Sequence, residues 1–278
     1  MATFVVSSIY QNLNGTNNMN SINKTMYIPL YGKALVSKKG IILQDKKAEE
    51  IWDKVQFPLK GKSKSKWLAY YMGMRSAVFD KWLGNQLDNY PNAVVLHLGC
   101  GLDSRILRVA NDTMWYDVDF ADVITERKLH YQETDMYYMV ASDLADTAFV
   151  DSMPKAEHVI VVMEGVSMYL TNEQLQQLLA KLCNHFEKLS LLVDCYTPFA
   201  AKMSKIKNPV KDVGVNKVYG VKNAQVLECD TGLTFVAEHN ITPSHLIDHL
   251  KGGEKFVFKT LYAGKTSKKL YKLYEYIK

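Results

Sequence analysis

Short apolar runs of strand length alternate with amphipathic stretches of helix length, and this alternation constrains the fold more than any other feature of the sequence. The strand-length runs are 93–98, 114–120, 136–141, 158–163 and 189–195. The stretches between them have the length and apolar spacing of helices: 103–110, 121–131, 146–153 and 171–186. This order predicts a parallel sheet that is covered by helices on both faces.

We therefore expect an α/β fold with a doubly wound, mostly parallel, seven-stranded sheet. Residues 1–90 are predicted to form a loose arm over 1–25 and helices that pack on the core, beginning at about 45 and at 66. Residues 91–278 are predicted to form the ligand-binding domain, with an irregular basic lid at about 197–222 after the fifth strand. The remaining elements predicted are a helix at 222–229, a strand at 232–238, a helix at 243–250 and a last strand at 255–262.

Composition narrows the class of protein. The formal net charge of +5 is too small to imply nucleic-acid binding, and no apolar run has the length of a membrane helix. The four cysteines form no C-x-x-C pair, which predicts neither a disulfide framework nor a zinc knuckle. His245 and His249 have metal-ligand spacing, but a surface helix explains them better, so we predict no metal site. We expect a cytoplasmic protein without membrane or nucleic-acid partners and leave its oligomeric state open.

A glycine-rich turn, Gly99-Cys100-Gly101, follows the first predicted strand. Two glycines allow a tight turn and a close approach of a ligand to the backbone. A dinucleotide fingerprint would have a third glycine where Ser104 stands, and Asp103 would repel a pyrophosphate. The turn therefore disfavours NAD or FAD and suits a cofactor that carries a sulfonium and an ammonium group without phosphate.

Carboxylates end the next three predicted strands. Asp119 lies 20 residues after Gly99, at the distance expected for an acidic residue that binds ribose hydroxyls, and Asp117 shares its face. An N-cap role explains Asp119 almost as well. Asp143, beside Leu144, has the chemistry to bind an adenine, and Glu164 requires a partner because a carboxylate at the end of an apolar strand is costly.

With these residues in view, the sequence resembles the leucine carboxyl methyltransferase family, which includes the tetracenomycin-type polyketide O-methyltransferases. The most specific strings are Leu-Gly-Cys-Gly-Leu-Asp-Ser-Arg at 98–105 and Glu-Gly-Val-Ser-Met-Tyr-Leu at 164–170. Further similar strings lie at 41–51, 74–80 and 116–120, so the resemblance covers about residues 40–200 in the family's order. It implies a Rossmann-like class I methyltransferase that uses S-adenosylmethionine.

The resemblance also implies roles for particular residues. Arg75 would pair with the cofactor carboxylate, Gly99 and Gly101 would shape the turn around its methionine portion, and Asp119 would hold the ribose. Asp143 and Leu144 would bind the adenine, and Glu164 would lie near the amino group or the transferred methyl. The expected cofactor-binding residues are thus Arg75, Gly99, Cys100, Gly101, Asp119, Asp143, Leu144 and Glu164.

The methyl acceptor is less constrained by the sequence. We expect a carboxylate or hydroxyl of a small, polyketide-like molecule, or a peptide carboxylate. A carboxylate needs no general base, and no catalytic residue is identified: His97 is expected in the core, and Tyr169 either touches the substrate or packs under a helix. The alternatives are an RNA- or protein-directed methyltransferase and, from another class, a non-catalytic nucleotide-type binding protein or an NAD-dependent oxidoreductase.

Overall fold

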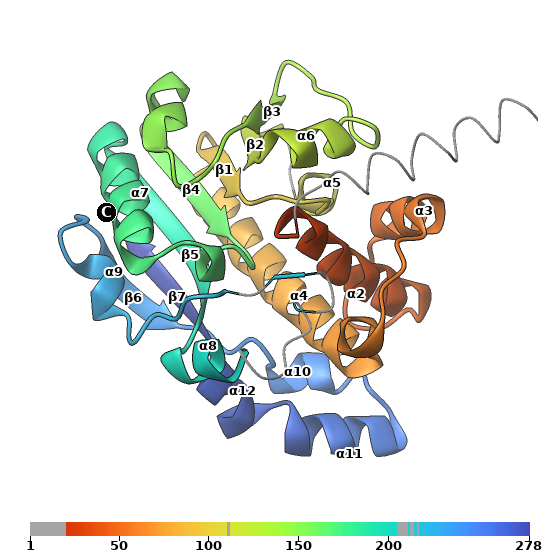
Figure 1. The fold of residues 1–278 in the computed structure, drawn as a ribbon. Coiled ribbons are helices and arrows are strands. Elements are labelled where there is room, and N and C mark those ends of the chain that lie inside the picture. The colour runs from red at the N-terminus through yellow and green to blue at the C-terminus, as the bar shows by residue number, and fades with distance from the viewer. Residues whose placement is uncertain (1–20, 110–111, 205–210, 212–213, 216) are drawn as a thin grey trace, which may run out of the picture.

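The computed structural model describes residues 21–109, 112–204, 211, 214–215 and 217–278, and within them one sheet of seven strands runs through the molecule (Figure 1). The strands are β1 (Val94–Leu98), β2 (Trp115–Asp119), β3 (Tyr137–Ala141), β4 (His158–Met163), β5 (Lys188–Tyr196), β6 (Thr234–Glu238) and β7 (Tyr271–Ile277). Their order is β3-β2-β1-β4-β5-β7-β6, and only β7 pairs antiparallel with its neighbours. The predicted mostly parallel, seven-stranded sheet is confirmed.

Helices surround this sheet. Before it come η1 (Asn23–Met26), α2 (Tyr27–Lys38), α3 (Lys46–Val55), η2 (Gly61–Lys64) and α4 (Lys66–Asn89). Between the parallel strands lie α5 (Arg105–Val109), α6 (Ala121–Arg127), η3 (Thr147–Ser152), η4 (Ser167–Tyr169) and α7 (Asn172–His185). After β5 follow α8 (Pro198–Ser204), α9 (Gln225–Glu228), α10 (Ser244–Ile247), α11 (Gly252–Leu261) and α12 (Gly264–Leu270). None of the helices in the described ranges combines the length and apolar character that a membrane crossing requires.

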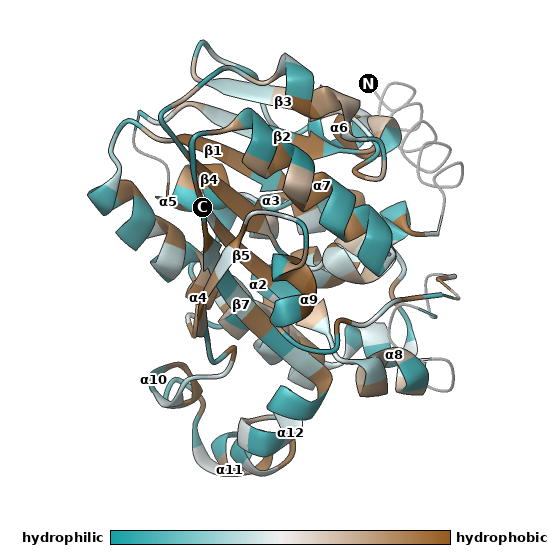
Figure 2. Ribbon diagram, turned by 90° about the vertical axis from the view of Figure 1, so that its left-hand side faces the viewer, coloured by the Kyte–Doolittle hydropathy of each residue, from teal (hydrophilic) through white to brown (hydrophobic). Residues whose placement is uncertain are grey.

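The sheet separates two apolar cores, because successive residues of a strand point to opposite faces. In β4, Ile160 and Val162 pack with α2, α4 and α10, whereas Val159 and Val161 pack with η3, α7 and α9. Both faces of the central strands are therefore covered, as their continuous apolar runs predict. Figure 2 shows the apolar strands enclosed between helices whose outward residues are hydrophilic.

Capping interactions set where two of the helices begin. The side chain of Asp45 accepts a hydrogen bond from the Ala48 amide and thereby begins α3. Thr171 and Gln174 form the predicted capping box at the start of α7. These side chains satisfy amide groups that have no partner within the helix, and so they fix the residue at which each helix begins.

Several predicted elements differ from the structure. The strand expected at 255–262 is wrong: these residues lie mostly in α11, and the last strand is β7. The helix α2 was not predicted, and the stretch at 146–153 contains the 3-10 helix η3 rather than an α-helix. The predicted helices at 222–229 and 243–250 are the four-residue turns α9 and α10. Residues 1–20 of the expected arm and part of the expected lid lie outside the described residues, so both stay predictions.

Candidate functional site

A cavity opens at the carboxyl ends of β1, β2 and β4, where an open parallel sheet binds its ligands. The loops after these strands supply Gly99 to Asp103, Asp119 to Phe120, and Glu164 to Val166. The 22–29 segment of η1 and α2 closes the cavity from the opposite side, and α4 contributes Leu68, Met72 and Arg75. Three parts of the sequence that are far apart from one another therefore line one cavity.

The turn after β1 requires glycine. Gly99 and Gly101 have φ angles of +70° and +51°, in the left-handed region that other residues rarely adopt. A Cβ atom at position 99 would lie 2.6 Å from Cγ2 of Val166, so the loop after β4 also excludes a side chain there. Cys100, between the two glycines, is buried, and burial raises the pKa of its thiol well above the usual value. Cys100 therefore lines the cavity as a neutral group.

Asp119 lies at the carboxyl end of β2 and faces this turn. Its Oδ2 accepts a hydrogen bond from the Gly101 amide at 2.8 Å, and its Oδ1 accepts one from the Phe120 amide at 2.8 Å. Burial raises the pKa of Asp119 to about 6, although the two amide hydrogen bonds act in the opposite direction. Each carboxylate oxygen retains acceptor capacity, so the residue is suited to bind a pair of vicinal hydroxyls.

Arg75 joins α4 to the ends of β4 and β5. Its Nε lies 3.0 Å from Oε1 of Glu164, and its Nη1 lies 2.7 Å from Oδ2 of Asp194. The other oxygen of Asp194 accepts a hydrogen bond from the Gly165 amide at 2.6 Å. Burial raises the pKa of Asp194, although the Arg75 guanidinium acts in the opposite direction. Burial would raise the pKa of Glu164 as well, but Arg105 and Arg75 together hold it below its usual value.

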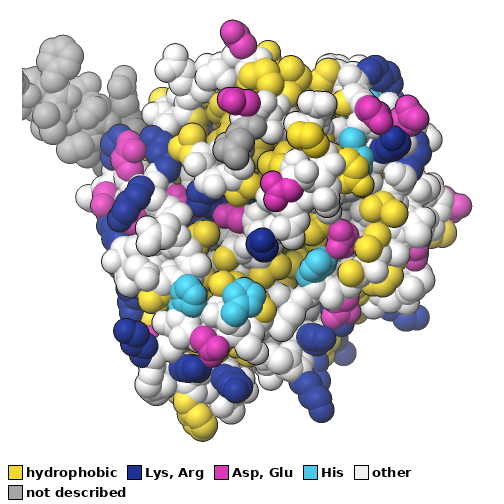
Figure 3. All heavy atoms as spheres, turned by 180° about the vertical axis from the view of Figure 1, so that it is seen from behind, with side chains coloured by type: hydrophobic (Ala, Val, Ile, Leu, Met, Phe, Trp, Pro, Cys, Tyr) yellow, Lys and Arg dark blue, Asp and Glu magenta, His cyan; other side chains and the backbone are white. Residues whose placement is uncertain are grey.

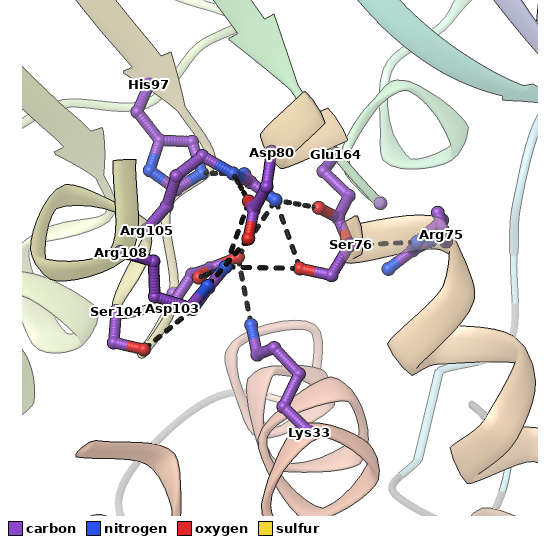
Figure 4. A network of polar contacts seen from close by, with 12 residues as sticks. Lys33, Arg75, Ser76, Asp80, His97, Asp103, Ser104, Arg105, Arg108 and Glu164 are labelled. Atoms are coloured by element: carbon purple, nitrogen blue, oxygen red, sulfur yellow. Dashed lines mark hydrogen bonds and ion pairs between the residues drawn. The ribbon is translucent and has the colours of Figure 1, made fainter. Parts of the chain in front are cut away.

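A second set of ion pairs lies next to Arg75 (Figure 4). Lys33 reaches from α2 to Asp103, with 2.9 Å between Nζ and Oδ2, and both side chains are buried. Arg105 contacts Glu164 and also donates to Asp80 at 2.7 Å. The wall of the cavity therefore presents buried cations and carboxylates in alternation, an arrangement that suits a zwitterion.

His97 lies beside these charges, near the carboxyl end of β1. Nη1 of Arg105 lies 3.1 Å from its Nε2, and its Nδ1 lies 3.0 Å from Oδ1 of Asp117. Because a guanidinium only donates, Nε2 accepts and Nδ1 donates to Asp117. Burial lowers the pKa of His97, which is consistent with this neutral form. His97 is buried as expected, although its edge lines the cavity.

The structure brings most of the predicted site residues together and separates others. Arg75, Gly99, Cys100, Gly101, Asp119 and Glu164 all line the cavity. Asp143 and Leu144 do not line it: Asp143 is exposed and caps the Ala145 amide, and Leu144 packs in the core beneath α7. Asp117 is buried in an ion pair with Arg127 and supports β2 from within.

Sequence reasoning missed several residues of the cavity. Lys33 is buried in a helix that was not predicted, and its only signal is a cation among apolar residues. Phe120 follows Asp119 directly and adds an apolar wall beside it. In the described part of the chain no group of three or more His, Cys, Asp or Glu residues could hold a metal, and His249 instead accepts a hydrogen bond from the Ile42 amide.

Aromatic residues form the other end of the cavity. Tyr169, Tyr196 and Tyr271 come from η4, β5 and β7, and the rings of Tyr196 and Tyr271 meet edge to face with centroids 4.5 Å apart. Burial raises the pKa values of Tyr169 and Tyr271, so both hydroxyls stay protonated at neutral pH. This end thus combines apolar surface with hydrogen-bond donors, as small-molecule sites do.

The sequence model of the leucine carboxyl methyltransferase family matches residues 21–183, which is more than half of the chain and includes the loops described above. The chain belongs to the leucine carboxyl methyltransferase family. The resemblance expected from the motifs at 98–105 and 164–170 is thereby confirmed.

Individual proteins agree with this assignment. The chain is 28% identical over 243 residues to the tetracenomycin polyketide synthesis O-methyltransferase of Streptomyces glaucescens, an alignment that covers 86% of this chain and 90% of that protein. It is 31% identical over 135 residues to an S-adenosyl-L-methionine-dependent methyltransferase of Gibberella zeae, covering 45% of each protein.

Solved structures share the fold. Magnesium protoporphyrin IX methyltransferase from Synechocystis PCC 6803, with bound SAH, superposes with a TM-score of 0.52 at 14% identity and covers 84% of this chain and 93% of its own. A methyltransferase-like protein from Thermobifida fusca gives a TM-score of 0.54 at 9% identity, with 88% and 93% covered. The chain is an S-adenosylmethionine-dependent methyltransferase with the class I fold.

The residues of the cavity fit this cofactor. Lys33 and Arg75 offer cations for its carboxylate, Glu164 offers an anion for its amino group, and Asp119 faces the glycine turn where a ribose is bound in such sheets. Val166 packs directly against Gly99, so the loop after β4 holds the glycine turn in place beside the cavity. The donor set contains no phosphate-binding glycine triplet, which argues against a dinucleotide.

Proposed function

We propose that this enzyme transfers the methyl group of S-adenosylmethionine to an oxygen atom of a small, largely apolar acceptor, and that this oxygen belongs to a carboxylate. The observation that carries the proposal is the shape of one cavity. It extends from Asp119 and Gly101, past Arg75 and Glu164, to Tyr169, Tyr196 and Tyr271. Cofactor and acceptor groups are therefore accommodated end to end.

At the cofactor end, each charged residue is proposed to bind a particular group of S-adenosylmethionine. Arg75 and Lys33 already hold carboxylates, so an incoming carboxylate exchanges partners with Glu164 and Asp103 instead of entering an unpaired cationic site. The freed Glu164 then accepts from the cofactor's ammonium group. Asp119 accepts from the ribose hydroxyls, and the adenine extends past Phe120 toward Asp143 and Leu144 at the end of β3, which pairs with β2.

The acceptor end favours a group that is already ionised. S-adenosylmethionine supplies a methyl group on a positively charged sulfur, which an acceptor oxygen displaces in line. Tyr169 and Tyr271 stay protonated, so they orient the acceptor as hydrogen-bond donors and take no proton from it. His97 is held between Asp117 and Arg105. A carboxylate needs no proton removed, and the aromatic walls exclude water from it.

The comparison over most of the chain supports a small-molecule acceptor of this kind, since a polyketide O-methyltransferase is matched along 90% of its length. A hydroxyl acceptor and a peptide carboxylate remain the neighbouring possibilities for the same chemistry. The expected cytoplasmic location also stays a prediction; it is consistent with four free thiols at Cys100, Cys183, Cys195 and Cys229.

Labelled S-adenosylmethionine tests the proposal directly. The enzyme is incubated with matched pairs of aromatic compounds that bear either a carboxyl or a phenol group, and the labelled products are treated with mild base. We expect label in base-labile esters. Label that appears only in base-stable ethers refutes the carboxylate acceptor, and binding of S-adenosylhomocysteine without turnover of any oxygen acceptor refutes the O-methyl transfer.

A further inference from the structure

One end of the molecule concentrates positive charge. Residues 251–272 contain seven lysines and one glutamate, so this segment has a net charge of +6 while the whole chain has +5. The segment includes α11 and α12, which lie with α10 at the same end of the molecule in Figures 1 and 2. Figure 3 shows Lys and Arg side chains gathered at this lower end.

The single glutamate of the segment does not neutralise these lysines. Glu254 pairs with Lys66 of α4 at 2.8 Å and accepts a hydrogen bond from Tyr70, which fixes α11 to the core. Lys255 pairs with Asp248 and Lys272 pairs with Glu238, so two lysines of the segment are also engaged. Lys259, Lys265, Lys268 and Lys269 are exposed. The outward face of α11 and α12 is therefore strongly cationic.

Apolar side chains are exposed among these lysines. In α11, Phe258 is fully buried, whereas Phe256 is 72% exposed and Leu261 is 57% exposed. Leu270 of α12 and Phe199 and Met203 of α8 are exposed as well, and the Thr197 amide binds the Leu270 carbonyl at 3.0 Å. Helices α8, α11 and α12 thus present one surface that carries lysines and apolar tips together.

We infer that this surface, formed by α8, α11 and α12, docks on an anionic lipid bilayer. Large exposed apolar side chains ringed by lysines insert between lipid headgroups, while the ammonium groups pair with lipid phosphates. A nucleic acid fits the surface less well, because three of its five exposed apolar side chains, those of Leu261, Leu270 and Met203, are aliphatic and offer bases no stacking partner. Charge complementarity and the exposed apolar tips thus point to the same occupant.

The docking surface adjoins the acceptor end of the cavity. Tyr271, the residue that follows α12, lines the cavity together with Tyr196 at the end of β5, immediately before α8. A bilayer bound to α8 and α12 therefore lies against the two helices that adjoin these cavity tyrosines in the sequence. The inference concerns where the enzyme works and holds whichever oxygen is methylated.

Vesicle co-sedimentation of the full chain tests the inference. We expect binding to vesicles of phosphatidylglycerol mixed with phosphatidylcholine, none to phosphatidylcholine alone, and loss of binding when NaCl is raised from about 0.05 M to about 0.5 M. The double variant Phe256→Ser/Leu261→Ser is expected to weaken the partition coefficient by about tenfold or more. The variant Lys265→Glu/Lys268→Glu/Lys269→Glu is expected to abolish the preference for anionic vesicles.

A matched control distinguishes binding through this surface from non-specific binding by exposed apolar side chains. Leu107 and Leu129 are each 63% exposed and lie outside α8, α11 and α12, so Leu107→Ser/Leu129→Ser is expected to bind as the unaltered chain does. Equal binding to neutral and anionic vesicles, or equal loss in both double variants, overturns the inference. The inference is also overturned if light scattering shows a dimer that dissociates in the Phe256→Ser/Leu261→Ser variant. Binding of an RNA oligonucleotide in place of vesicles overturns it too. S-adenosylhomocysteine affinity reports folding and is expected to stay unchanged in all variants.

Discussion

Arg75 and Asp194 form an ion pair in the interior, with 2.7 Å between Nη1 of the guanidinium and Oδ2 of the carboxylate. Through the Gly165 amide, which donates to the other oxygen of Asp194, this pair ties α4 and β5 to the loop after β4. The same guanidinium lines the cavity and holds Glu164. One buried contact thus connects the stability of the fold with the position of a guanidinium that we propose binds the cofactor.

Replacing Asp194 by alanine is expected to destabilise the protein strongly. The variant leaves Arg75 with one carboxylate fewer and removes the acceptor of the Gly165 amide, so we expect a loss of about 3–5 kcal/mol in the free energy of unfolding. Urea denaturation measures it. Asp194→Asn keeps an acceptor for the amide and should lose less; an alanine variant as stable as the unaltered protein contradicts the role of this pair.

Replacing Arg75 by lysine tests whether its fork geometry matters for the cofactor. A lysine keeps the charge but cannot bind two groups in a plane, so we expect the Kd for S-adenosylhomocysteine to rise by about tenfold or more. Isothermal titration calorimetry provides the Kd. The comparison variant is Arg108→Lys, which alters the ion pairs with Asp45 and Asp80 and reaches the cavity only through Asp103. Equal losses in both variants would refute a direct role for Arg75.

Asp119 predicts how cofactor binding depends on pH. Its carboxyl has a pKa of about 6 in the folded protein, above the usual value, because it is buried. Under the proposed function the ionised form accepts the ribose hydroxyls, so we expect affinity to be fully present above this pKa and to fall by up to about tenfold per pH unit below it. Titration calorimetry between about pH 5 and about pH 7.5 measures this slope. Asp119→Asn should bind weakly with a flatter profile, and an unchanged slope in that variant rules the assignment out.

Two Gly→Ala substitutions, one in the glycine turn and one in α4, are expected to have opposite effects on stability. An alanine at position 99 would have to adopt a φ of +70° and would place its Cβ 2.6 Å from Val166, so Gly99→Ala should cost about 2 kcal/mol or more and abolish cofactor binding. Gly84 in α4 has open space around its Cα, so Gly84→Ala should stabilise the protein by about 0.5–1 kcal/mol. Thermal unfolding with and without S-adenosylhomocysteine distinguishes the two effects. A Gly99→Ala protein that still binds the cofactor refutes the packing argument.

The variant Tyr271→Phe distinguishes an effect on the acceptor from an effect on the cofactor. The substitution keeps the ring against Tyr196 and removes a protonated hydroxyl, which under the proposed function donates to the acceptor oxygen. We expect kcat/KM for the acceptor to fall by about tenfold while the cofactor Kd is unchanged. Initial rates under varied acceptor give the first quantity and calorimetry gives the second. A loss confined to cofactor affinity would show that the acceptor binds elsewhere.

The central part of the fold was predictable because its signals are local. The strands β1 to β5 are short apolar runs separated by helices, and their order along the chain determines a parallel sheet. The run around Phe256 and Phe258 misled the prediction, since a short apolar stretch suits either a strand or a helix. In α11 only Phe258 is buried, and the sheet is completed by β7 instead.

The site was predictable where it lies on strand ends and was missed where it lies on the N-terminal helices. Gly99, Asp119 and Glu164 follow apolar strands, so their position at the ligand edge could be inferred. The helix that carries Lys33 buries residues on most of its sides, including Tyr27, Leu30 and Ala34, and therefore shows no amphipathic stripe. Asp143 was predicted in the site but does not line the cavity. The position of a carboxylate after a strand does not determine the direction of its side chain.

The position of β7 also constrains when the protein can fold during synthesis. This strand, residues 271–277, lies between β5 and β6 and is the only strand in the described ranges that pairs with β6. A ribosome-bound chain that lacks these residues leaves one edge of β5 open and β6 without a neighbour. Completion of the sheet, and with it placement of Tyr271 in the cavity, must follow translation of this stretch.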